Sequence, residues 1–82
     1  MVKRELMPKD GRKSFYGKAY TIDGGSWEAL YSYGTLIARR DGDGLRRYWP
    51  ERADDFTATT GRHIAAWCGL NKAAFLALPL DC

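Results

Sequence analysis

The residues best suited to chemistry are one histidine and two cysteines, and their spacing argues against a catalytic site. His63, Cys68 and Cys82 are the only residues of these types in the 82-residue chain. Cys68 follows His63 by five residues, whereas side chains that meet on a helix are three or four apart. No serine or cysteine lies where the sequence would pair a nucleophile with His63, and no two carboxylates form a recognisable acid/base pair. We therefore expect no catalytic residues and no enzyme activity, with His63 packing on Trp67 near the start of a helix.

Metal binding finds little support in the sequence. The segment Asp41-Gly42-Asp43 resembles the start of a calcium-binding loop. Such a loop needs an oxygen ligand at its fifth position, glycine at its sixth and glutamate at its twelfth. Those positions hold Leu45, Arg46 and Arg52. One histidine and two cysteines, without a Cys-x-x-Cys pair, do not make a zinc site either. We expect no metal ligands and no cofactor.

A tight hairpin is the better interpretation of the segment from Asp41 to Gly44, because aspartate and glycine tolerate the positive φ that such turns need. If the turn is symmetric, Arg39 lies opposite Arg46, and Ile37 lies opposite Tyr48. Alternation along the strands then predicts a core face formed by Leu36, Ala38, Leu45 and Trp49.

The other face of this hairpin would present Arg39, Arg46 and Tyr48 to a partner. Like charges directly opposite each other cost stability, and an anionic partner would relieve that cost. Arginines beside aromatic rings suit single-stranded nucleic acid and also suit an acidic protein surface. The alternative is a solvated hairpin with an acidic residue, Glu28 or Glu51, nearby. A register slip of one residue would make Arg40 and Arg47 the exposed arginines instead.

Composition indicates a single globular domain with a mild positive charge. Hydrophobic residues make up 45% of the chain, and the net charge is +3, which permits an anionic partner without requiring one. Residues 1–13 predict an irregular basic lead-in, and residues 14–82 predict a single α+β domain. The chain shows no apolar run suited to a membrane span or a signal peptide, so we expect a cytoplasmic protein with no membrane partner.

The elements expected to position these residues are four strands and one or two short helices. Period-two alternation and turn residues predict strands over 14–22, 27–33, 35–40 and 45–49. Thr59 or Thr60 can cap a helix that ends at Gly69, and Asn71 can cap a second one. The predicted fold is α+β, a four-stranded antiparallel meander followed by one or two short helices packed on one face. Its core should contain Ile64, Trp67 and Phe75.

Three stretches resemble a family of short, functionally uncharacterised proteins of phages and bacterial mobile elements. The stretches are Lys13–Ala19 with Phe-Tyr-Gly-Lys-Ala, Leu30–Ala38 with Ser-Tyr-Gly-Thr, and Ala58–Ile64 with Thr-Thr-Gly-Arg-His-Ile. The resemblance covers most of residues 13–69 and brings no established activity and no catalytic residues. The segment 49–56, which precedes the Thr-Thr pair, is longer and more acidic than the resemblance leads us to expect.

The resemblance implies a mobile-element setting, in which small non-enzymatic proteins block host defence or regulate transcription. Our first hypothesis is therefore an inhibitor of a host nucleoprotein machine, of the anti-CRISPR type, that binds a protein or nucleoprotein complex. The alternative is a nucleic-acid-binding accessory or regulatory protein, and an enzyme ranks third. An inhibitor should show little affinity for free strands, whereas a nucleic-acid binder should bind them with an affinity that falls as salt rises.

Overall fold

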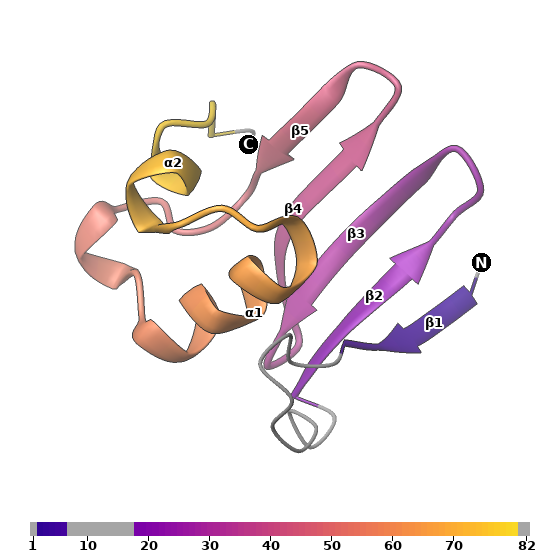
Figure 1. Cartoon of the computed structure of the whole chain (residues 1–82), viewed down its shortest axis with the longest axis horizontal. Coiled ribbons are helices and arrows are strands. Elements are labelled where there is room, and N and C mark those ends of the chain that lie inside the picture. Colours follow the sequence, from indigo (N-terminus) through magenta and orange to yellow (C-terminus); the bar gives the residue numbers. More distant parts are fainter. Residues whose placement is uncertain (1, 7–17, 81–82) are drawn as a thin grey trace.

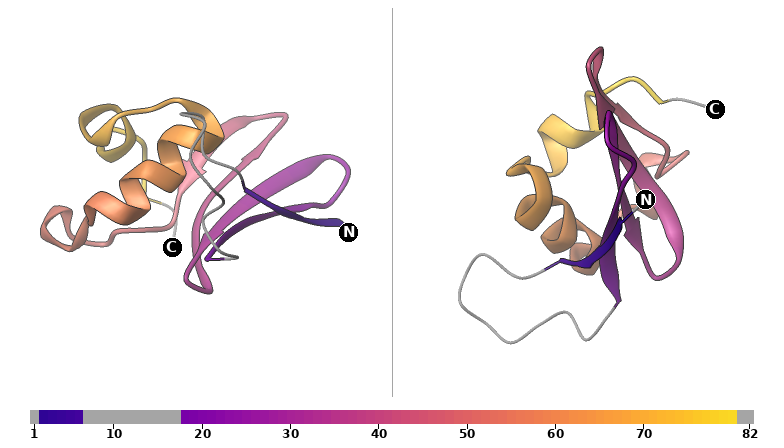
Figure 2. Two further views of the ribbon diagram at one scale, coloured as in Figure 1. Left: turned by 60° about the horizontal axis from the view of Figure 1, so that its bottom comes forward. Right: turned by 90° about the vertical axis from the view of Figure 1, so that its right-hand side faces the viewer.

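The computed structural model describes residues 2–6 and 18–80. Five antiparallel strands form one sheet whose spatial order follows the sequence (Figure 1). They are β1 (Val2–Glu5), β2 (Ala19–Asp23), β3 (Trp27–Ser32), β4 (Thr35–Asp41) and β5 (Gly44–Arg47). A short 3-10 helix, η1 (Ala53–Asp55), then leads to α1 (Ala58–Cys68) and α2 (Lys72–Leu76). Both α-helices lie on the same side of the sheet (Figure 2). The predicted α+β fold, an antiparallel meander followed by short helices, is confirmed.

Strand β1 is an addition to the predicted meander. Residues 1–13 were expected to be irregular, but Val2–Glu5 pairs with β2, and the Leu6 N–H donates to the Ala19 carbonyl at 3.1 Å. All four side chains of β1 are exposed. An edge strand held by main-chain pairing needs no apolar alternation, so the usual sequence signal is absent. Residues 7–13 of the predicted lead-in and residues 14–17 of the first predicted strand lie outside the described residues.

The β4–β5 hairpin has the register that the turn chemistry predicts. Arg39 pairs with Arg46, and Asp41 pairs with Gly44. The Asp41 carboxylate accepts a hydrogen bond from the Asp43 N–H at 2.8 Å, which closes the turn locally.

A β-bulge changes which side chains of β4 are buried. The β3–β4 register shifts so that Leu30 pairs with Ala38 while Tyr31 pairs with Leu36, which leaves Ile37 as the extra residue. Ile37 and Ala38 are consequently both buried. Strict alternation placed Leu36 in the core and Ile37 on the other face. Both assignments are wrong, because one inserted residue reverses the alternation on one side of it.

The two helices are capped by side chains that precede them. The Thr57 hydroxyl accepts from the Thr60 N–H at 3.2 Å, so α1 begins earlier than the predicted cap at Thr59 or Thr60. Gly69 ends α1 with a φ of 76°, as expected. Asn71 caps α2 by accepting from the Ala74 N–H at 2.8 Å, also as expected.

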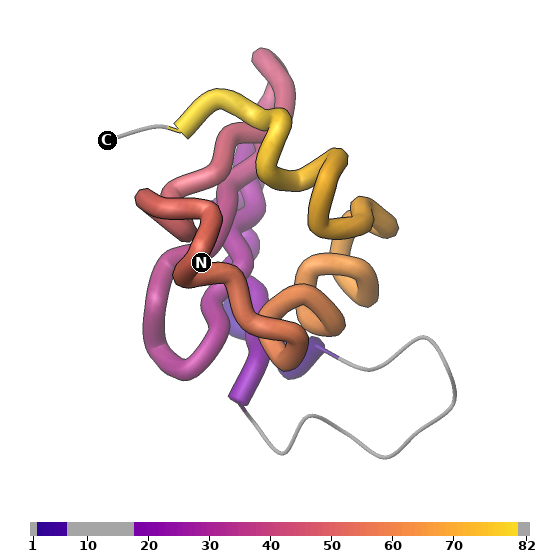
Figure 3. Tube along the Cα trace, turned by 90° about the vertical axis from the view of Figure 1, so that its left-hand side faces the viewer, coloured from indigo at the N-terminus to yellow at the C-terminus, as the bar shows by residue number. Residues whose placement is uncertain are grey.

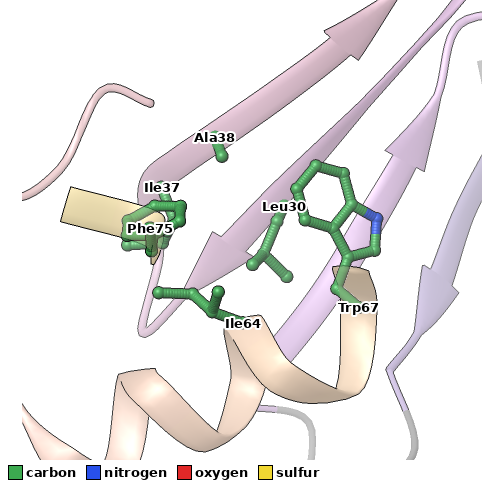
Figure 4. Packing of buried hydrophobic residues seen from close by; sticks show 6 residues of the cluster. All are labelled: Leu30, Ile37, Ala38, Ile64, Trp67 and Phe75. Atoms are coloured by element: carbon green, nitrogen blue, oxygen red, sulfur yellow. The ribbon is translucent and has the colours of Figure 1, made fainter. Parts of the chain in front are cut away.

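The core lies between the helices and the sheet. The predicted core residues Ile64, Trp67 and Phe75 are all buried there, which confirms that prediction (Figure 4). Leu30, Ile37 and Ala38 complete the buried cluster from the sheet side. Leu45 and Trp49, two of the residues expected on the core face of the hairpin, are partly buried and pack against this cluster.

Arg47 fastens the C-terminal segment to the sheet. Its guanidinium group donates to the main-chain carbonyls of Leu78 at 3.0 Å and Pro50 at 2.6 Å. A parallel bridge joins the strand residue itself to Leu80. The connection from β5 to the first turn of α1 can be followed in Figure 3. Arg47 thus serves the fold, because its donors are directed at main-chain acceptors of this chain.

Candidate functional site

The sheet face turned away from α1 and α2 is the candidate binding surface. Leu30 and Ser32 contact the helices, so alternation directs Ala29 and Tyr31 to the opposite side. Residues paired across strands share a face, and the register therefore defines the outer face. It comprises Lys3, Glu5, Tyr20, Ile22, Trp27, Ala29, Tyr31, Leu36, Arg39, Asp41 and Arg46. Figure 2 shows the sheet on edge, with α1 and α2 on the other side.

A column of stacked groups crosses three strands of the outer face. The rings of Tyr20 and Tyr31 lie 5.3 Å apart between centroids and are nearly parallel, with an interplanar angle of 6°. The ammonium of Lys3 lies 4.3 Å from the Tyr20 ring centroid. Cross-strand aromatic pairs and cation–π contacts each stabilise a sheet modestly. In this column the Tyr20 and Tyr31 rings are stacked on each other, and the Lys3 ammonium lies over the Tyr20 ring.

A second cation–aromatic pair lies at the other end of the outer face. The Arg39 guanidinium carbon is 5.0 Å from the Trp27 ring centroid. The Arg39 Nε atom lies 3.9 Å from an Asp41 carboxylate oxygen and has no hydrogen-bond partner although it is buried. A Cβ atom at Gly24 would come within 2.1 Å of the indole, so the ring rests directly on the main chain of the β2–β3 turn. Only glycine at position 24 leaves room for the indole there.

The five arginine and tyrosine residues predicted from the hairpin separate onto different parts of the molecule. Arg39 and Arg46 face each other on the outer face, as predicted, with Arg46 exposed and Arg39 half-buried. Tyr48 follows β5, is half-buried, and donates its N–H to the Ile37 carbonyl at 2.8 Å. Arg40 and Arg47 lie on the helix side of the sheet.

Arg40 belongs to a satisfied contact between sheet and helix. The Trp67 indole N–H donates to a Glu28 carboxylate oxygen at 2.8 Å, and the Arg40 guanidinium bonds to the same oxygen. The Arg40 guanidinium carbon also lies 4.6 Å from the Trp67 ring centroid. Glu28, proposed as an acidic neighbour of the paired arginines, therefore neutralises Arg40 instead, while Asp41 accompanies Arg39.

All three stretches that carry the family resemblance meet at the end of β3. The Ser32 hydroxyl lies 2.8 Å from His63 Nδ1 and 3.1 Å from the Thr60 hydroxyl. The Tyr33 ring lies 5.9 Å from the His63 ring between centroids. The main-chain N–H of Tyr33 donates to the Lys18 carbonyl at 2.7 Å. The structure thus joins Lys18 from the first stretch, Ser32 and Tyr33 from the second, and Thr60 and His63 from the third.

The Ser32–His63 contact was not predicted from the sequence, since nothing in the spacing paired a serine with the histidine. A serine bonded to a histidine can serve as a nucleophile with its base. Here both residues are 2% exposed, and Thr60 also engages the serine oxygen. Burial, with a smaller effect of the Arg62 charge, lowers the pKa of His63. The geometry favours a polar contact that docks α1 on β3, with the His63 ring bonded to Ser32 and lying beside the Tyr33 ring.

Two further properties concern the described ranges 2–6 and 18–80. No three metal-ligating side chains come together there to hold an ion. No helix in these ranges is long and apolar enough to cross a membrane.

These features define a class of small α+β domain, with five antiparallel strands, two short helices on one side and a basic, aromatic outer face. The chain belongs to DUF8033, a family of unknown function, whose model matches residues 2–75. No curated protein and no solved structure matches the chain. The matched region includes every strand, so the outer face lies within it. The family description names no activity, and the mobile-element setting stays a prediction.

Proposed function

We propose that this protein is a non-enzymatic binding domain whose outer face binds single-stranded nucleic acid. The observation that carries the proposal is the column of Lys3, Tyr20 and Tyr31 on the sheet face turned away from the helices. Unpaired bases stack on aromatic side chains presented by a sheet, and nearby cations contact the phosphates. Such a role would place the protein in the cytoplasm, in keeping with its cysteine content.

Stacking rather than charge should dominate this interaction. The outer face carries three cations, Lys3, Arg39 and Arg46, against two carboxylates, Glu5 and Asp41. Base stacking on one aromatic side chain contributes about 1–3 kcal/mol. Three phosphate contacts would give a slope of about −2 for the logarithm of the association constant against the logarithm of salt concentration. We therefore expect affinity to fall with salt, but less steeply than for a strongly basic protein.

The first hypothesis from the sequence, an inhibitor of a host nucleoprotein machine, is the second candidate. Its support is the pair of arginines held opposite each other on β4 and β5, one of them exposed. Such a pair also complements an acidic protein surface. It explains less of the outer face, because it gives the parallel tyrosine rings no part in binding.

Fluorescence anisotropy with a labelled polypyrimidine oligonucleotide tests the proposal. Replacing both tyrosines, Tyr20→Leu with Tyr31→Leu, should weaken binding at least tenfold while the far-ultraviolet circular dichroism stays unchanged. Lys72 is a matched control for Lys3, because its ammonium also lies over an aromatic ring, 5.5 Å from the Phe56 centroid, but away from the outer face. Lys3→Gln should weaken binding and Lys72→Gln should not.

Equal affinity in the double tyrosine variant and the wild type would refute the outer face as the binding surface. The inhibitor hypothesis instead predicts no binding to free strands, together with stable retention of one protein complex from a host lysate.

A further inference from the structure

The turn between β3 and β4 holds a tyrosine in a backbone conformation that suits other residues better. Tyr33 and Gly34 form a two-residue turn with φ values of 52° and 79°. Tyr33 is the only non-glycine residue with a positive φ in the described ranges. Asparagine, aspartate and glycine adopt this left-handed conformation most readily, whereas other residues lose about 1–2 kcal/mol. The fold alone would therefore favour asparagine at this position.

Burial of the Tyr33 ring does not offset this cost. The residue is 56% exposed, the most exposed of the large apolar or aromatic residues within the described ranges. The ring lies beside His63 on one element and 5.7 Å from the Lys18 ammonium on another. An exposed aromatic ring retained in a strained turn points to a contact with something outside the chain.

Tyr33 borders a pocket of about 350 Å³ between the β3–β4 turn, η1 and the first turn of α1. Its lining includes the aromatic residues Tyr33 and Trp49. It also includes the polar residues Thr35, Thr59 and Asp55, all of them exposed. These last three side chains have no hydrogen bond or ion pair within the described ranges, whereas the Ser32 and Thr60 hydroxyls are bonded to each other.

Among the polar residues of the lining, Asp55 favours a ring that donates hydrogen bonds, whereas threonine hydroxyls both donate and accept. A carboxylate accepts hydrogen bonds and repels phosphate, so the pocket suits the base of a nucleotide rather than its phosphate. Aspartate accepts from the exocyclic amino group of cytosine, but it meets an acceptor at the same place on thymine or uracil. The volume lies at the small end of ligand pockets, which suits a single planar ring.

We propose that this pocket receives one unpaired cytosine, a single-ring base with an exocyclic amino group, from the strand that crosses the outer face. The Tyr33 ring stacks on the base, the Asp55 carboxylate accepts from its amino group, and Lys18 contacts the adjoining phosphate. The pocket lies on the helix side of the sheet, so a strand stacked on the tyrosine column would pass around the end of β3, where Tyr33 follows Tyr31 by two residues. The inference rests on the proposed function and adds a base preference to it.

The test compares oligonucleotides of cytosine and of thymine on the wild type and two pocket variants. The wild type should prefer cytosine about tenfold, a discrimination within the range of one base contact. Asp55→Asn should abolish that preference, because an amide offers both a donor and an acceptor. Asp54→Asn is the matched control, since Asp54 also lies in η1 and is exposed but does not line the pocket. It should leave the preference unchanged.

Tyr33→Asn separates the role of the ring from the stability of the turn. This variant should melt at the same temperature as the wild type or higher, because asparagine suits the left-handed conformation. It should nevertheless bind the cytosine oligonucleotide about tenfold more weakly, having lost one stacking ring. A lowered melting temperature together with unchanged binding would overturn the proposal, because the ring would then serve only the fold.

Failure of the pocket and failure of the outer face give different results. Equal wild-type affinity for cytosine and thymine oligonucleotides would overturn the pocket while leaving the outer face intact. Binding of neither oligonucleotide would overturn both proposals. Titration with cytidine monophosphate tests the pocket without the outer face. It should shift the amide NMR signals of Thr35 and Thr59, which uridine monophosphate should leave in place.

Discussion

The two sides of the sheet each place an arginine on a tryptophan, and the two pairs differ in how they are satisfied. On the helix side, Arg40 and Trp67 share the Glu28 carboxylate, and Trp67 is 8% exposed. On the outer face, Trp27 rests on the turn main chain, and the buried Arg39 Nε has no hydrogen-bond partner. Similar residues thus form a finished structural contact on one side and an incomplete one on the other. An incomplete contact is where a ligand can add hydrogen bonds.

The largest expected effect separates the two tryptophans by stability. Trp67→Ala should lower the free energy of unfolding by about 3–5 kcal/mol, the range for removal of a large buried aromatic residue. It also leaves Glu28 without its indole donor. Trp27→Ala should cost less than half as much, because that ring is only half-buried. Urea denaturation followed by circular dichroism measures both values. Equal losses would show that the outer-face pair is as structural as the other.

The next effect concerns binding through the paired arginines. Reversing both charges, Arg39→Glu with Arg46→Glu, should weaken binding of an anionic partner well over tenfold, since like charges at an interface cost several kcal/mol. The fold should survive, because opposed glutamates repel much as opposed arginines do. Arg52→Glu with Arg62→Glu makes the same change in net charge at exposed positions off the outer face. If both pairs reduce anisotropy-measured affinity equally, net charge rather than the outer face governs binding.

A smaller effect should follow from moving the Trp27 indole without changing it. Gly24→Ala introduces a Cβ that would approach the ring within 2.1 Å, so the indole must shift away from the turn. We expect severalfold weaker oligonucleotide binding and a change in tryptophan fluorescence. Gly25→Ala is the control, because its Cβ meets nothing within 4 Å although its φ of 93° strains the backbone. Gly25→Ala should therefore lower stability while keeping the affinity of the folded protein.

The smallest effect is a pH dependence on the helix side. Burial lowers the pKa of His63 in the folded protein below its ordinary value of 6.5. The unfolded chain therefore binds more protons between those two pKa values, and stability falls as pH drops below about 6.5. Above that value the full contribution is present. His63→Gln should flatten this part of the pH profile in thermal melts. An unchanged profile would show that His63 does not titrate on unfolding in this range.

Features set by local turn and cap chemistry were predictable from the sequence. The Asp-Gly turn determined the β4–β5 register, and Asn71 and Gly69 marked helix boundaries. The β-bulge at Ile37 was not predictable, because it depends on how β3 and β4 meet rather than on β4 alone. Strand β1 was not predicted, because all four of its side chains are exposed and its sequence shows no apolar–polar alternation.

The candidate site likewise has parts that local sequence patterns predicted and parts that they did not. The opposition of Arg39 and Arg46 was predicted from one hairpin turn. The Tyr20–Tyr31 stack depends on the register between β2 and β3, and predicting two separate strands does not specify that register. Ser32 and His63 meet although they are 31 residues apart in sequence. Docking of α1 on the end of β3 brings them together, and no local pattern encodes that contact. Alternation did offer one signal, since it places Ser32 on the same face as the core residue Leu30.

The sequential strand order also bears on how fast the chain reaches its native state. Each strand pairs with its neighbours in sequence, so three successive tight turns bring β2 to β5 together without a crossover. Such local topology shortens the loops that must close and favours rapid folding. Contacts that span longer stretches, such as Ser32 with His63 and Arg47 with Leu78, tie the C-terminal segment to the sheet. We expect the hairpins to form first and the helices to dock onto them as the later step.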